Sequence, residues 1–173
     1  MQGFSFVLCI ALLFIIAWED FKHRAVHVIW YPMLFCALTL YVYFVVGLAN
    51  WYLNVGLNLL FLAIQGGLLV LYFVLKHKKW VNITEHYIGW GDVFFLISVV
   101  ALFTPLMYVL FYLTSLLAVV FVVLMYRLLV KDIKFIPLAG LQAVWLSLGL
   151  IYQQFISGFL FTTSFDSFFI SNS

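Results

Sequence analysis

The sequence predicts an all-α, polytopic membrane protein with about six transmembrane helices, and two observations carry this prediction. Of the residues, 68% are hydrophobic and only 8% are charged, whereas ordinary soluble domains contain roughly 25% charged residues. Such a chain cannot cover a surface that faces water, so we expect the lipid bilayer to surround it. Apolar stretches of membrane-spanning length also recur along the chain, which excludes a single anchor. We therefore expect residues 1–173 to form one six-helix transmembrane domain.

Apolar stretches in the first half of the chain predict the first three spans. Residues 3–18 form the first, and because they lack the basic n-region and cleavage site of a signal peptide, we expect this helix to be retained. The second covers residues 28–48, and the asparagines and glycines between 47 and 58 predict a turn after it. The third covers residues 57–75 and stops at the basic stretch 76–79.

Residues 93–126 contain no charged side chain, and this stretch is too long for one span. A straight helix of that length would extend about 51 Å, whereas the hydrocarbon core of a bilayer is about 30 Å thick. Thr104-Pro105 lies near the middle, and the proline predicts a break or tight turn there. The fourth and fifth spans are then expected at 92–106 and 108–126, and the sixth at 135–160.

The basic residues predict which side of the membrane each loop faces. With six spans, all Lys and Arg residues fall in the loops after spans one, three and five: Lys22, Arg24, Lys76, Lys78, Lys79, Arg127, Lys131 and Lys134. Loops that are rich in Lys and Arg lie in the cytoplasm. We therefore expect these loops to be cytoplasmic and both termini to lie outside.

Gly89-Trp90-Gly91-Asp92 is a glycine-rich turn that ends in a carboxylate, directly before the long uncharged stretch. A charged residue at the mouth of a membrane segment is costly, so it indicates a functional site. The two glycines allow backbone conformations that are closed to other residues and let another segment approach closely. A structural alternative is that Asp92 is a helix N-cap at the positive end of the fourth span.

A second carboxylate, Asp20, favours the functional interpretation. Asp20 closes the first span and Asp92 opens the fourth, with one out-and-back hairpin between them, so both are expected at the cytoplasmic membrane boundary. Two carboxylates that lie close together cannot both ionise easily, and they share one proton. The result is an acid and a base in one site, which can activate a water molecule and protonate an amide leaving group. The sequence thus predicts an active site on the cytoplasmic side.

No metal ion or other cofactor is expected, and no nucleic-acid partner. The histidines lack the HExxH spacing or a similar metal-binding pattern; they are His23, His27, His77 and His86. Serine and cysteine side chains lack a recognisable nucleophile motif. The aspartate pair is therefore the strongest candidate for catalysis.

These residues resemble the type IV prepilin peptidase family of GxGD aspartic proteases, in its short form without the N-methyltransferase region. The resemblance rests on Asp20 after the first span, the basic loop that follows it, and the GWGD sequence that opens a later span. Ile136-Pro137-Leu138-Ala139-Gly140 is also similar to the motif with an Ile-Pro pair that precedes the final helix of the family.

The resemblance implies that Asp20 and Asp92 are catalytic and that Gly89 and Gly91 belong to the active-site loop. The implied substrates are prepilin-like proteins, cut after a glycine on the cytoplasmic side of their hydrophobic segment. The implied location is the bacterial cytoplasmic (inner) membrane. Because the paired cysteines of the longer members are missing, we expect peptidase activity alone.

The chain departs from the family pattern at two places, which bear on substrate preference. Val26 and His27 stand where the family usually has an Ile-Pro pair, and Val93-Phe94-Phe95 stands where a basic residue is common. Two alternatives from other classes are a small proton- or cation-coupled transporter and an inactive structural homologue. A transporter would more typically place its carboxylates near the bilayer midplane. The sequence does not predict substrate-binding residues, the oligomeric state or the role of the tail 162–173.

The charge pattern makes a prediction about topology. Cysteines introduced at Asn50 and at Lys78 should be labelled from opposite sides of the membrane, because one expected span separates the two positions. The measurement is labelling with a membrane-impermeant thiol reagent in intact cells and in inverted vesicles. Labelling of both positions from the same side would contradict the six-span arrangement.

Overall fold

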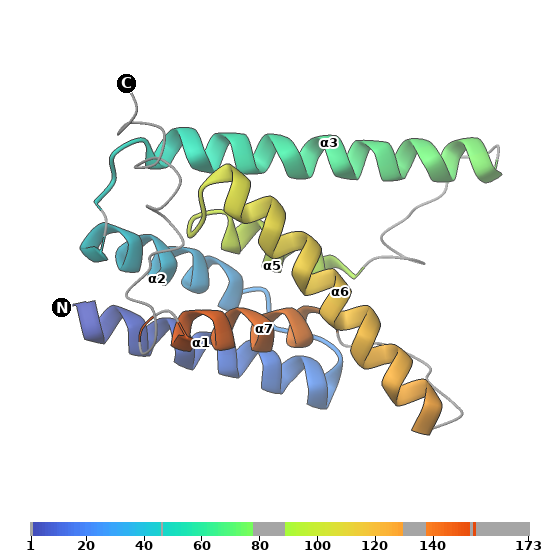
Figure 1. Ribbon diagram of the computed structural model, residues 1–173, viewed down its shortest axis with the longest axis horizontal. Coiled ribbons are helices and arrows are strands. Elements are labelled where there is room, and N and C mark those ends of the chain that lie inside the picture. Colours follow the sequence, from blue (N-terminus) through green and yellow to red (C-terminus); the bar gives the residue numbers. More distant parts are fainter. Residues whose placement is uncertain (1, 46, 78–88, 130–137, 153, 155–173) are drawn as a thin grey trace.

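The computed structural model describes residues 2–45, 47–77, 89–129, 138–152 and 154. Within these ranges the chain is all-helical and contains no strand. Consecutive helices run in alternating directions (Figure 1). They are α1 (Gln2–His23), α2 (Trp30–Val45), α3 (Trp51–His77), α5 (Trp90–Val99), α6 (Pro105–Leu129) and α7 (Leu138–Tyr152).

Three of these helices are long and apolar enough to cross a membrane: Gly3–His23, Trp51–Lys76 and Pro105–Tyr126. The apolar helices α2, α5 and α7 are shorter, with 16, 10 and 15 residues. At 1.5 Å per residue, α5 rises only about 15 Å, roughly half the thickness of a hydrocarbon core. Large apolar side chains are exposed along α3 and α6, as expected for surfaces that face lipid. The predicted membrane character is confirmed at this level.

The core of the bundle lies where α1 packs against α2 and α7. The buried side chains of α1 recur every three or four residues, which places them on one face of the helix; they are Cys9, Leu12, Leu13, Ile16 and Ala17. The facing stripe of α7 consists of Ala139, Ala143, Leu146 and Leu150. Small residues at this interface let the two helix backbones approach closely.

The break predicted at Thr104-Pro105 is confirmed. α5 ends at Val99 and α6 begins at Pro105, where a proline is tolerated because the first N–H of a helix has no partner within it. The predicted fourth span of 92–106 is wrong in its extent, since residues 100–104 form a turn instead of a continuation of the helix.

The turn predicted through residue 58 is also wrong in its extent, because α3 already begins at Trp51. The side chain of Asn58 is buried and donates hydrogen bonds to the carbonyls of Val100 (3.0 Å) and Phe103 (2.8 Å). The indole N–H of Trp51 donates to the carbonyl of Ala101 (3.0 Å). The end of α5 leaves carbonyls without helical partners, and polar groups of α3 bind them. Asn58 therefore belongs to the packed interior and not to a turn.

One end of the bundle, on the right in Figure 1, carries the basic residues that the structure describes. α1, α3 and α6 end there, while α2, α5 and α7 begin there. The basic residues at these helix ends are Lys22, Arg24, Lys76 and Arg127. The other basic residues of the predicted cytoplasmic loops lie outside the described residues, as does the tail 162–173; they are Lys78, Lys79, Lys131 and Lys134.

Candidate active site

Asp20 lies near the end of α1 and faces the interior of the bundle. The helix continues to His23, past the expected end of the first span at residue 18. Asp20 extends the buried stripe of α1 by one more turn, and only 8% of the residue is exposed. Its Oδ2 atom accepts a hydrogen bond of 2.5 Å from the backbone N–H of Gly140 on α7.

Asp92 lies in the first turn of α5, at the same end of the bundle (Figure 1). The N-cap of α5 is Gly89, so Asp92 is not the N-cap residue, although it does lie at the positive end of the helix. The backbone N–H of Asp92 donates to the carbonyl of Gly89 at 3.1 Å. The Asp92 carboxylate interacts with the backbone of Ala139 and of Gly89.

The N-terminus of α7 thus holds both carboxylates on adjacent residues. The backbone of Ala139 interacts with Asp92, and the backbone N–H of Gly140 donates a hydrogen bond to Asp20. The N–H groups in the first turn of a helix have no partners within the helix, and the helix dipole adds partial positive charge there. This is a favourable place for an anion. Helices α1 and α5 each bring one carboxylate to it, and the two carboxylates interact electrostatically with each other.

Gly140 is needed for this arrangement because α1 passes very close to it. A Cβ atom at this position would lie 3.0 Å from Oδ2 of Asp20, 3.2 Å from its Cβ and 3.4 Å from the backbone oxygen of Ala17. Any side chain here would push α1 away from α7 and lengthen the hydrogen bond to Asp20. The glycine therefore fixes both the packing of two helices and the position of one carboxylate.

Tyr31, near the start of α2, was not singled out from the sequence, but its hydroxyl lies beside Gly91, the residue before Asp92. Its hydroxyl interacts electrostatically with Asp20 and Asp92, and 2% of the residue is exposed. A Cβ atom on Gly91 would lie 2.8 Å from this hydroxyl, so a side chain at position 91 would displace the tyrosine. The spacing of buried residues along α2 could have identified it, since Tyr31, Leu34 and Leu38 share one face.

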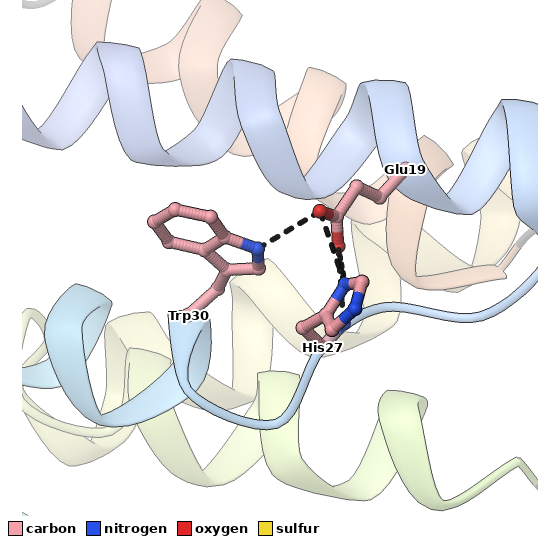
Figure 2. Close-up of polar contacts among 3 residues, drawn as sticks. All are labelled: Glu19, His27 and Trp30. Atoms are coloured by element: carbon pink, nitrogen blue, oxygen red, sulfur yellow. Dashed lines mark hydrogen bonds and ion pairs between the residues drawn. The ribbon is translucent and has the colours of Figure 1, made fainter.

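A polar clamp formed by Glu19, His27 and Trp30 holds the connection between α1 and α2 (Figure 2). Glu19 accepts hydrogen bonds from the backbone N–H of His27 (3.0 Å) and from the indole N–H of Trp30 (3.0 Å), and it pairs with the His27 ring at 3.1 Å. Glu19 directly precedes Asp20, and Trp30 directly precedes Tyr31. The clamp therefore fixes the two backbone segments that carry these inward-facing side chains.

The described geometry brings together most of the residues selected from the sequence. Asp20, Asp92, Gly89 and Gly91 lie at one end of the bundle, whereas most of the loop 76–91 lies outside the described residues. Val26 and His27 are in the connection between α1 and α2. Within the described ranges, no group of three or more His, Cys, Asp or Glu side chains could hold a metal ion. No protein-family model, curated protein or solved structure matches the chain.

The role of Gly140 leads to a stability prediction. Gly140→Ala should lower the free energy of unfolding by about 1–3 kcal/mol, because the added methyl group overpacks the contact with α1. The measurement is thermal or denaturant unfolding of the purified protein in detergent.

Gly67→Ala is the matched control, since a Cβ atom at this position of α3 meets nothing within 4 Å. Alanine is a better helix former than glycine, so this variant should be as stable as the wild type or up to about 1 kcal/mol more stable. Equal stability of the Gly140→Ala and Gly67→Ala proteins would contradict the close approach of α1 to α7.

Proposed function

We propose that the protein is a membrane aspartic endopeptidase of the prepilin peptidase type, with Asp20 and Asp92 as its catalytic pair. One observation carries the proposal. The carboxylates of Asp20 on α1 and Asp92 on α5 interact with two adjacent residues at the N-terminus of α7. Asp20 is buried and Asp92 is half-buried. Carboxylates inside an apolar bundle are costly, and they indicate function when they lie close together.

The proposed chemistry divides two roles between the aspartates. The ionised aspartate takes a proton from a water molecule, and the resulting hydroxide attacks the carbonyl carbon of the scissile peptide bond. The protonated aspartate donates a hydrogen bond to the carbonyl oxygen as negative charge develops on it. A proton then passes to the amide nitrogen, the C–N bond breaks, and the site returns to one shared proton. Both roles need two carboxylates in one place, which the α7 N-terminus provides.

The proposed setting is the bacterial cytoplasmic membrane, with six spans and both termini outside. The alternating directions of the helices and the basic residues at one end of the bundle support this topology. α5 begins at the end of the bundle that carries the described basic residues, which supports a site near the cytoplasmic boundary. A prepilin-like substrate would present the cytoplasmic edge of its hydrophobic segment to this site, where water for hydrolysis is also available.

A proton- or cation-coupled transporter is the main alternative. Its ion-binding site would be expected at the turn between α5 and α6. Broken helices in transporters offer free carbonyl groups to ions near the middle of the membrane. Here Asn58 binds the carbonyls of Val100 and Phe103, and Trp51 binds that of Ala101. With these groups occupied by protein donors, the geometry favours the peptidase.

The test is cleavage of a co-expressed or purified prepilin-like substrate by single and double aspartate variants. Asp20→Asn, Asp92→Asn and the double variant should each lose several powers of ten in rate, and the losses should not add, because the two groups act as one unit. Each variant keeps a side chain of the same size, so all three proteins should still insert into the membrane.

Glu85→Gln is the control, since it removes a carboxylate that is not a member of the proposed pair. It should retain most of the wild-type activity. Cleavage by the Asp92→Asn protein at the wild-type rate would overturn the peptidase proposal and favour the transporter.

A further inference from the structure

The hydroxyl of Tyr31 is a buried polar group that takes part in no hydrogen bond within the described part of the fold. Only 2% of the residue is exposed, and its hydroxyl has no hydrogen-bond partner among the described residues. A buried hydroxyl without a partner costs free energy, so native proteins rarely keep one without a reason. The hydroxyl of the buried Tyr108, by contrast, donates to the carbonyl of Leu96 at 3.0 Å.

The position of this hydroxyl is rigid. The backbone carbonyl of Tyr31 accepts a hydrogen bond of 2.9 Å from the hydroxyl of Ser98 on α5. The Tyr31 ring packs against Phe94 with ring centroids 5.9 Å apart. The residue before Tyr31 is also held, because the indole N–H of Trp30 donates a hydrogen bond to Glu19 on α1 (Figure 2). The phenol is therefore held in place before any substrate arrives, as is expected of a group that stabilises charge in a transition state.

The hydroxyl points toward Gly91 at the start of α5, next to Asp92. It lies next to the α-carbon of Gly91, in the space that a Cβ atom would need. It also interacts electrostatically with both Asp20 and Asp92. A phenol can donate one hydrogen bond, and the space between two carboxylates is where the oxygen atoms of a reacting peptide bond would lie.

We propose that Tyr31 is a further catalytic residue, whose O–H donates a hydrogen bond to the carbonyl oxygen of the scissile peptide bond. This inference rests on the proposed peptidase function. As the water oxygen bonds to the carbonyl carbon, the carbonyl oxygen gains negative charge, and the hydrogen bond from Tyr31 strengthens. The tyrosine keeps its proton throughout, so the proton transfers remain those of the two aspartates. Glycine at position 91 leaves the space that brings the phenol and the substrate backbone together.

The test variant is Tyr31→Phe, which removes only the hydroxyl. Its kcat should fall by about 10²–10³-fold, the usual loss when one oxyanion donor is removed. KM should stay nearly unchanged, because the interaction forms mainly in the transition state. The melting temperature should be equal to that of the wild type or higher, because the lost hydroxyl has no partner within the described structure.

Tyr41→Phe is the matched control. Tyr41 lies on the same helix, is 3% exposed and packs its ring against Phe6, but it is remote from the aspartates along α2. This variant should keep the wild-type kcat. A wild-type kcat for Tyr31→Phe, or a loss of activity that accompanies an equal loss of stability, would overturn the inference.

The same experiment separates this inference from the proposed function. If the wild-type protein cleaves the substrate and the Asp20→Asn protein does not, the peptidase proposal stands whatever Tyr31→Phe does. If Tyr31→Phe then cleaves normally, only the role of Tyr31 fails. If the wild-type protein itself does not cleave, both fail together.

Discussion

The interactions of the first turn of α7 with two carboxylates are what the candidate site depends on. Two carboxylates in an apolar bundle repel each other and lose hydration, and each effect costs free energy. Adjacent backbone N–H groups at a helix N-terminus offset part of this cost. For the arrangement to form, α1 must end, α5 must begin and α7 must begin at the same end of the bundle (Figure 1). Gly140 then sets how closely α1 can approach.

Buried hydrogen-bond donors in the described part of the bundle differ in whether they have a partner, and the difference separates structural roles from the candidate functional one. Asn58 and Trp51 donate to carbonyls that the end of α5 leaves free, so their hydrogen bonds complete the fold. The Glu19 clamp likewise binds groups within the connection it stabilises. The hydroxyl of Tyr31 has no such partner within the described residues, although its ring is held firmly. A rigidly held donor without a partner in the described structure can donate its hydrogen bond to a substrate.

Much of the fold could be predicted because hydrophobicity along the chain is a strong signal. The apolar stretches and the proline at position 105 identify most helix boundaries, and the charge pattern brings Asp20 and Asp92 to one expected side. Other features depend on contacts between distant residues. The sequence around Asn58 is typical of a turn, but its side chain donates hydrogen bonds to carbonyls more than forty positions away. The roles of Gly140 and Tyr31 follow from the close packing of α1, α5 and α7, which no local pattern contains.

The central claim is that Asp20 and Asp92 lie together, and cysteine cross-linking in native membranes tests it most directly. In a protein whose Cys9 and Cys36 have been replaced, Asp20→Cys with Asp92→Cys should cross-link rapidly with a short bifunctional thiol reagent. Asp20→Cys with Asn54→Cys should not, because position 54 lies near the start of α3, at the opposite end of the bundle. Equal cross-linking of the two pairs, or none in the first pair, would contradict the account.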